Sequence, residues 1–261
     1  MAEKLSEKDI ENINIEGTEE YAVMPLRNTV LFPQQVIPIY IGREKSLKLI
    51  SDIELEKRKY IIVVAQEDGS IEDPSTEDLY SYGTLATVLK VFAMPDNSKS
   101  AIVQGIARVK ILDYLRKDPY FKAAVSKVSD DPISDSLELN DIVDNLRTSF
   151  ADLIKVAPNL TEEHTGMLSN IKKPNRLVDR AVSLMTLPNQ EKQEILEEVN
   201  VKSRIDKAIS IINREIQRIK LGEEIQTEVH DEIAKTQREY YLREQMKAIQ
   251  KELGEDEGTV E

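Results

Sequence analysis

Cysteine and tryptophan are absent from this chain of 261 residues, and phenylalanine occurs only four times. Without cysteine the chain can form neither a disulfide nor a thiolate metal site. Its two histidines, His164 and His230, lie far apart in charged segments, where solvated surface histidines are typical. The sequence therefore does not predict a Ser-His-Asp triad. A folded core must be built mainly from isoleucine, leucine and valine.

The sequence also lacks the signatures of nucleotide-binding and hydrolytic sites. No glycine precedes a lysine, which excludes a GxxxxGK[ST] phosphate loop, and no G-x-S-x-G or HExxH motif occurs. Carboxylates are abundant, but their densest runs (19–20, 197–198 and 255–257) are typical of solvated faces and tails. Paired catalytic acids need burial to shift their pKa values. We therefore predict no catalytic, cofactor-binding or metal-binding residue in this chain.

Long apolar runs are missing as well. The longest uninterrupted one, Tyr60–Ala65, has six residues, whereas a membrane-spanning helix needs about 20. Residues 1–20 contain no apolar stretch of the kind found in secretory signals. We expect a cytoplasmic protein without a membrane partner.

The net charge of −13 is concentrated at the two ends. Residues 1–20 contain seven acidic residues against two lysines, and residues 252–261 contain five acidic residues and no basic one. Acidic ends of this kind are typical of solvated, poorly ordered segments. We interpret 1–19 as an acidic disordered tail and 255–261 as a flexible end, between which the charge is nearly balanced.

Residues 20–130 contain short β-branched runs separated by turn residues, a pattern typical of strands. The predicted strands are 21–26, 36–41, 59–66, 84–93, 101–112 and 121–128. One amphipathic helix is predicted at 46–56. The pattern predicts a compact, mostly antiparallel, barrel-like β domain.

A helical pattern begins after Asp130, so we predict a helical subdomain over 131–221. Its amphipathic segments lie near 137–156, 161–171, 174–187 and 189–199. Thr161 and Asn200 are predicted N-caps, and Pro174 suits the first turn of a helix. The expected fold class is α+β: a β-rich barrel-like domain, then a helical bundle, then a long helix.

The long helix is predicted from three apolar stripes at helical spacing. The stripes are Ile205, Ile209, Ile212, Ile216 and Ile219; then Leu221, Ile225, Val229 and Ile233; and finally Leu242, Met246, Ile249 and Leu253. Their phase slips at Leu221–Gly222, where glycine is either a kink or a tolerated residue in a continuous helix. We expect a coiled-coil-like helix over 222–254, projecting from about 223. Such narrow stripes need a partner, either a neighbouring subunit or a following domain.

The chain contains two distinctive motifs. The first is MPLRNTVLFP at 24–33, followed by Pro38 and by IGREKS at 41–46, and the second is QREYYLREQMKAIQKELG at 237–254. Both resemble motifs of Lon proteases. Shorter matches lie at 64–66, 78–80, 83–84 and 191–197. The resemblance covers residues 20–254, and the second motif is specific to this family, whereas free-standing Lon substrate-binding domains also carry the first.

The resemblance implies a PUA-like substrate-recognition domain over 20–130, a helical region and a long helix. In the parent enzyme, an AAA+ ATPase domain that uses ATP and Mg and a protease domain with a Ser-Lys dyad would follow. The parent would assemble as a homo-hexamer. The resemblance further implies that this chain stops where the ATPase domain would begin, so neither site corresponds to any residue here.

The function implied by the resemblance is capture of misfolded, damaged and selected regulatory proteins, together with tethering of the oligomer. Substrate-contact candidates are Leu31, Phe32, Pro33, Val36, Leu187 and Pro188. Assembly candidates are Leu242, Met246, Ile249 and Leu253. The alternative for the first group is ordinary core packing, and for the second it is packing within the full enzyme.

Two other functions stay open at the level of sequence. Residues 202–220 carry six basic side chains against two acidic ones, which is compatible with a nucleic-acid-binding module and so with DNA as a partner. The stretch lacks the interleaved aromatic residues that stack on bases. The other alternative is a purely structural oligomerisation arm.

Overall fold

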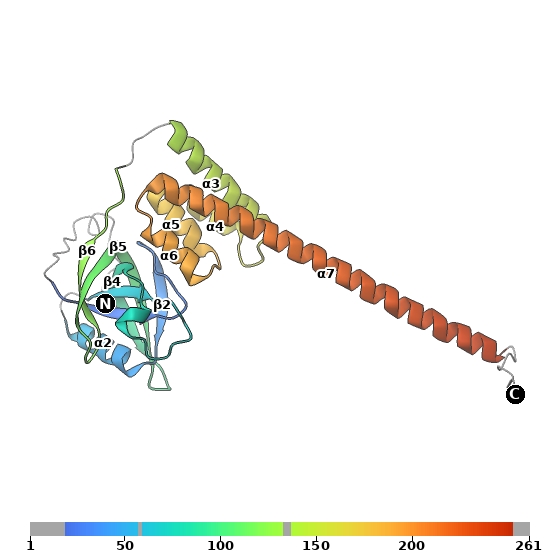
Figure 1. Cartoon of the computed structure of the whole chain (residues 1–261), viewed down its shortest axis with the longest axis horizontal. Coiled ribbons are helices and arrows are strands. Elements are labelled where there is room, and N and C mark those ends of the chain that lie inside the picture. The colour runs from blue at the N-terminus through green and yellow to red at the C-terminus, as the bar shows by residue number, and fades with distance from the viewer. Residues whose placement is uncertain (1–18, 57–58, 133–136, 253–261) are drawn as a thin grey trace.

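The computed structural model describes residues 19–56, 59–132 and 137–252. A curved β domain is followed by a group of short helices, from which one long helix projects (Figure 1). The predictions for the acidic tail, except residue 19, and for the C-terminal end, including Leu253, lie outside the described residues.

Six strands form one strongly curved sheet. They are β1 (Tyr21–Leu26), β2 (Val36–Ile41), β3 (Tyr60–Ala65), β4 (Tyr82–Ala93), β5 (Lys99–Arg116) and β6 (Lys122–Lys127). The spatial order is β2-β5-β4-β3-β1-β6, and an additional pairing of β5 with β6 closes the sheet into a barrel. Only β1 and β3 pair in parallel among the described strands. The predicted barrel-like, mostly antiparallel domain is thereby confirmed.

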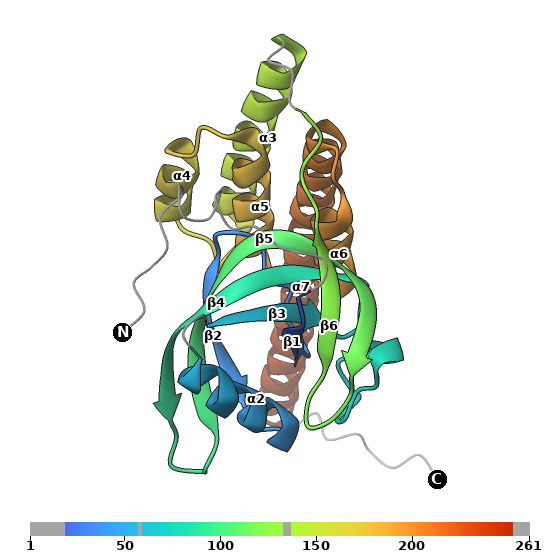
Figure 2. The same ribbon diagram turned by 90° about the vertical axis from the view of Figure 1, so that its left-hand side faces the viewer.

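Burial on both faces explains the uninterrupted apolar sequence of the central strand β3. Its run YIIVVA has no polar alternation, which is typical of a strand covered on both sides. One face packs against α2 (Glu44–Leu55), whose Leu49, Ile50 and Ile53 are almost fully buried. In Figure 2, α2 lies at the end of the barrel away from the helical region. A short 3-10 helix, η1 (Thr76–Asp78), precedes β4.

The helical region contains α3 (Leu137–Val156), α4 (Glu162–Ser169), α5 (Pro174–Leu184), α6 (Asn189–Glu197) and the first part of α7 (Val201–Glu252). The predicted helix starts are confirmed. Thr161 and His164 form a capping box, and Pro174 occupies the first turn of α5. Asn200 Oδ1 accepts a hydrogen bond from the Ser203 backbone N–H at 3.0 Å. These caps satisfy backbone donors that a helix start leaves unpaired.

Helix α7 is continuous over 52 residues, so the alternative of a tolerated glycine in a continuous helix is confirmed at Gly222. The separate helix expected from about residue 223 was wrong, and the boundary drawn at 222 falls inside α7. The isoleucine stripe packs on the helical core, with Ile205 and Ile212 fully buried. This packing supplies a stable nucleus, from which the charged remainder continues as helix. A Cβ at Gly222 would meet nothing within 4 Å, so the glycine is a tolerated solvent-exposed residue.

Beyond residue 220 the helix leaves the body of the protein. Residues 221–252 are all exposed, and at 1.5 Å per residue they extend about 48 Å from the helical region. Figure 1 shows this projecting part without a neighbouring element. Within the described chain, no helix combines the length and apolar character needed to cross a bilayer.

Candidate functional site

A groove separates the β domain from α5 and the segment that precedes it. Residues 32–36 form its β wall, and 170–173, Arg176, Asp179, Arg180 and Ser183 form its helical wall. Its volume is about 610 Å³, within the range of 300–1,000 Å³ that is common for ligand-binding clefts. Segments more than 130 residues apart in the chain thus meet at one cleft.

The β wall is held in place by β5 and β4. The Gln34 N–H donates to Gly105 O and the Gly105 N–H donates to Gln35 O, both at 2.9 Å. A Cβ at Gly105 would lie 2.2 Å from Phe32 O, so only glycine allows this close approach. The buried Thr84 hydroxyl donates to Leu31 O at 2.5 Å. The β wall is therefore preformed by contacts within the chain.

Gln34 has a left-handed backbone with φ of 64°. That conformation is unfavourable for a residue with a side chain, and such strain persists only where the surroundings hold it. With its amide oxygen turned toward Arg176, Gln34 accepts from Nη2 and Nε at 3.0 and 2.8 Å. This contact joins the two walls of the groove.

Charge is distributed unequally between the walls. Residues 32–36 carry no charged side chain, whereas the helical wall carries Lys172, Lys173, Arg176 and Arg180. Its one acidic residue, Asp179, is only 4% exposed and is engaged by two arginines. The groove therefore combines an uncharged wall with a basic one.

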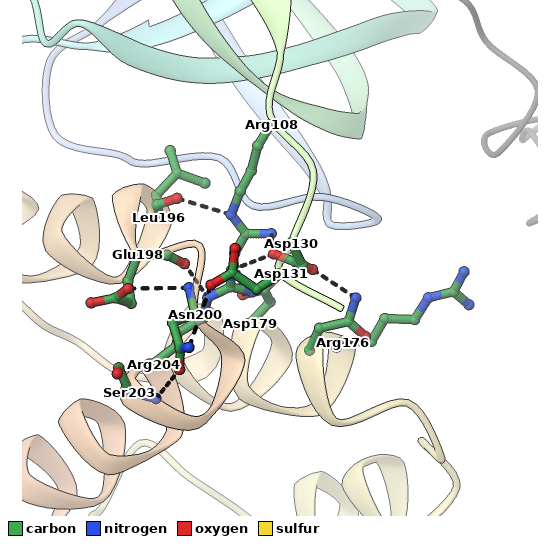
Figure 3. A network of polar contacts seen from close by, with 11 residues as sticks. Arg108, Asp130, Asp131, Arg176, Asp179, Leu196, Glu198, Asn200, Ser203 and Arg204 are labelled. Carbon is green, nitrogen blue, oxygen red and sulfur yellow. Dashed lines mark hydrogen bonds and ion pairs between the residues drawn. The ribbon is translucent and has the colours of Figure 1, made fainter. Parts of the chain in front are cut away.

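A buried cluster of two arginines and two aspartates joins the barrel to the helices (Figure 3). Arg108 of β5 contacts Asp179 of α5 at 2.5 Å and Asp130 at 3.8 Å. Arg204 of α7, fully buried, contacts Asp179 at 3.4 Å and also pairs with Asp130. The two arginines further donate to Leu196 O at 2.9 Å and to Glu198 O at 2.7 Å. The positive and negative charges balance, as buried ions require.

The same cluster sets the ionisation of Asp130. Burial by itself raises the pKa of a carboxyl group. The hydrogen bond from Arg204 and the charges of Arg108 and Arg204 outweigh this effect and hold the pKa of Asp130 below its ordinary value. Asp130 therefore stays ionised and keeps both arginines paired.

The structure gives the six predicted substrate contacts different roles. Leu31 and Phe32 are 2% and 1% exposed, so they cannot offer an apolar side chain to a partner at the surface. This corrects their expected role, since both side chains pack in the core and support the wall. Pro33 is half-buried and Val36 is 38% exposed, and both line the groove.

The remaining candidates, Leu187 and Pro188, lie outside the groove lining. Leu187 packs against the helical core and Pro188 is exposed before α6. The sequence analysis missed the helical wall. The run of basic residues at 172, 173, 176 and 180, spaced for one face of a helix, is the signal that could have located it.

The basic stretch 202–220 is used within the fold. Arg204 belongs to the buried cluster, and four further bases pair with carboxylates of this chain. These pairs are Lys202 with Glu138, Lys207 with Glu198, Arg214 with Glu191, and Arg218 with Glu215. A nucleic-acid footprint needs bases that face phosphates, so the arrangement does not favour the nucleic-acid reading.

The projecting part of α7 displays the other predicted contacts. Leu242, Met246 and Ile249 are 49%, 61% and 56% exposed. The upstream stripe from Leu221 to Ile233 is exposed to a similar degree. At 3.6 residues per turn, the two stripes lie on faces roughly 110° apart. Among the described residues, no cluster of acidic, histidine or cysteine side chains is arranged to hold a metal ion.

Comparison with known proteins gives a consistent result. The protein-family model of the ATP-dependent protease La (LON) substrate-binding domain matches residues 20–214. The Lon protease of Koribacter versatilis is 42% identical over 238 residues, which are 91% of this chain and 29% of that protein. That of Dictyoglomus thermophilum is 39% identical over 237 residues, which are 91% of this chain and 30% of that protein.

Solved structures share the fold. The N-terminal domain of Mycobacterium avium complex Lon protease has a TM-score of 0.60 at 19% identity, and the alignment covers 75% of this chain and 98% of that one. A Lon N-terminal domain protein from Xanthomonas campestris has a TM-score of 0.52 at 15% identity, with coverage of 74% and 98%.

A curved sheet joined to a helical region is thus the architecture of Lon N-terminal domains. The chain belongs to the family of LON substrate-binding domains. It spans about 30% of the length of the curated relatives it matches.

Proposed function

We propose that this chain is the substrate-recognition and tethering N-terminal region of an ATP-dependent Lon serine protease in the cytoplasm. Its partners in this proposal are unfolded, damaged and selected regulatory proteins. The use of ATP and Mg, the AAA+ ATPase and the Ser-Lys dyad belong to the remainder of the parent enzyme. Family membership supports the substrate-binding role, and the identity to whole Lon proteases supports the parent activity.

A largely apolar strip, partly exposed, that leads from the groove across the sheet supports the recognition proposal; Lys90 lies at its side, over the Phe92 ring. Pro38 of β2 pairs with Ile102 of β5, and Tyr40 of β2 and Phe92 of β4 both pair with Ser100. Directly paired residues point to the same face of a sheet. We call this set the outer strip: Val36, Pro38, Tyr40, Phe92 and Ile102. Val36 belongs to both the outer strip and the groove.

Exposure of this strip suits capture of unfolded chains. Tyr40 is 67% exposed and Phe92 is 39% exposed. Contiguous apolar side chains on a surface usually mark an interaction site. Unfolding exposes apolar residues that a folded protein buries, so weak contacts with such residues distinguish unfolded from folded proteins. β2 is also an edge strand of the described sheet, which supports pairing with an extended segment.

Binding of one fluorescently labelled protein, folded and unfolded, tests the proposal at low and high salt. We expect this chain to prefer the unfolded form with little effect of salt, because the contacts are apolar. The double variant Val36→Asp with Tyr40→Asp should lower the affinity about tenfold or more. Leu112→Asp with Leu115→Asp, which changes two exposed leucines farther along β5 by the same charge, is the matched control. Equal binding of folded and unfolded forms would contradict recognition and leave a structural arm.

Tethering is the second part of the proposal. A homo-hexameric parent requires contacts between copies, and the two exposed stripes of α7 supply apolar surface for them. Because the stripes face directions roughly 110° apart, one straight helix cannot cover both. We therefore propose that the stripe from Leu221 and the stripe from Leu242 contact different neighbours, which is what a closed ring needs.

A further inference from the structure

The groove differs from the outer strip in its charge. The protein carries a net charge of −13, yet one groove wall presents Lys172, Lys173, Arg176 and Arg180. These side chains lie on the segment before α5 and on its first turns. The β wall opposite contributes Pro33 and Val36 but no charge. A ligand that fits both walls must therefore combine apolar and negatively charged groups.

Asp179 does not neutralise this wall. Its carboxylate is buried and lies between Arg108 and Arg204, which belong to β5 and α7. Those two arginines compensate its charge from inside the protein. Lys172 is exposed and Arg180 is partly exposed at the groove, and Arg180 contacts the Met167 sulfur at 3.9 Å. The positive charge of the wall thus faces the groove.

We propose that the groove selects polypeptide segments in which acidic side chains flank an apolar residue; this inference rests on the proposed substrate-recognition function. The apolar side chain packs on Pro33 and Val36. The flanking carboxylates approach Lys172 and Arg180. The flexible remainder of the segment continues over the outer strip, which starts at Val36. Unfolded proteins would then be captured by their apolar content, and segments rich in Asp and Glu would be bound first.

A peptide fits these features better than a nucleic acid does. Base stacking needs exposed aromatic rings beside the basic residues, but Phe32, the aromatic side chain in the lining, is 1% exposed. The uncharged β wall offers no cationic partner to a phosphate.

Three labelled peptides of equal length test the inference on the complete chain. Each contains the same leucines and valines, flanked by glutamates, by glutamines or by lysines. Two or three screened ion pairs contribute modestly, so the glutamate peptide should bind roughly fivefold more tightly than the glutamine peptide. The lysine peptide should bind most weakly. High salt should remove the preference but not the residual binding of the glutamine peptide.

The decisive variant is Lys172→Gln with Arg180→Gln, which should abolish the preference for glutamate. Lys172 is exposed and Arg180 is only partly buried, so we expect folding to be unchanged, and the thermal unfolding midpoint checks this. Lys235→Gln with Arg243→Gln, on the projecting part of α7, makes the same change in net charge away from the groove. That control should keep the preference.

The outcomes separate this inference from the proposal beneath it. Equal binding of the glutamate and glutamine peptides, with loss of both in Val36→Asp, would overturn the acidic selectivity and leave substrate recognition standing. No binding of any peptide or of unfolded protein would overturn both. If a single-stranded oligonucleotide displaced the glutamate peptide at matched charge, the groove would be a general polyanion site and the inference would fail.

Discussion

Arg108 and Asp179 are 71 residues apart in sequence, and their side chains meet at 2.5 Å in the interior of the protein. One lies on β5 of the barrel and the other on α5, at the groove. Together with Arg204 and Asp130 they form a charged contact between the β domain and the helical region, whose apolar core also includes Val30, Phe32 and Ala65 of the β domain. The geometry of the groove depends on this contact.

Removal of the Asp179 carboxylate should therefore lower the free energy of unfolding. Asp179→Ala leaves Arg108 and Arg204 without their shared partner, and breaking a buried pair in this way typically costs about 3–5 kcal/mol. Urea unfolding monitored by circular dichroism measures the loss. Glu191→Ala, which breaks the exposed pair with Arg214, should cost less than about 1 kcal/mol. Equal losses of unfolding free energy in the two variants would show that the buried cluster stabilises the protein no more than an exposed ion pair does.

Acid should weaken the same cluster through Asp130. The pKa of Asp130 in the folded protein lies below its ordinary value of 3.8. The stabilisation is therefore fully present above pH 3.8 and is lost as the pH falls through the lower, folded-state pKa. Asp130→Asn should be less stable than the unchanged protein at neutral pH, and the difference should narrow as the pH is lowered below 3.8. A difference that is constant with pH would contradict the assignment.

Gly105→Ala should displace the β wall of the groove. The added Cβ would lie 2.2 Å from Phe32 O, so the loop must move. Such overpacking typically costs about 1–3 kcal/mol. We expect a lower unfolding midpoint and weaker binding of unfolded protein in the same variant. If stability fell while binding was unchanged, the position of residues 32–36 would be irrelevant to recognition.

Gly222→Ala should stabilise the protein, whereas Gly105→Ala destabilises it. The position is open to solvent inside a continuous helix, where alanine is more favourable than glycine by about 1 kcal/mol. Amide hydrogen exchange of the surrounding turns should slow, and helical circular dichroism should rise or stay constant. Faster exchange would mean that the glycine is required as a bend. The strands of the β domain, which lie away from the projecting part of α7 (Figure 1), serve as the internal control.

Assembly through α7 gives the last prediction. Aspartate at Ile225 disrupts the first stripe and aspartate at Ile249 disrupts the second. Each variant should lower the self-association measured by sedimentation velocity over a concentration series, and the double variant should be monomeric. Lys235→Gln, on the same part of the helix, should change association little. A monomeric unchanged protein at every concentration would confine tethering to the longer parent enzyme.

Local sequence patterns were sufficient to predict most of the strands and helices. Strands β1 and β2 and helix α3 begin and end where their apolar patterns and flanking turns predicted. The sequence analysis placed a boundary inside α7 because a change of stripe phase at Gly222 resembles the start of a new helix. The structure shows that the phase changes where α7 leaves the body, from a buried face to exposed ones.

The candidate site was less predictable because it depends on distant pairs. Phe32 and Val36 are both apolar and four residues apart, yet one is buried and the other exposed. The sheet register and the close approach of Gly105 determine this difference, and neither is visible in a local pattern. The helical wall comes from a segment about 140 residues later, so the groove exists only after the barrel and helices meet.

Helix α7 is also a lever. Its buried root, from Val201 to about residue 216, has a length of about 24 Å, and the exposed arm beyond residue 220 has a length of about 48 Å. Arg204, in the first turn of the root, shares Asp179 with the groove wall. If ligand binding moved that end of the root sideways by about 1 Å around its far end, the tip of a rigid arm would swing by about 2 Å.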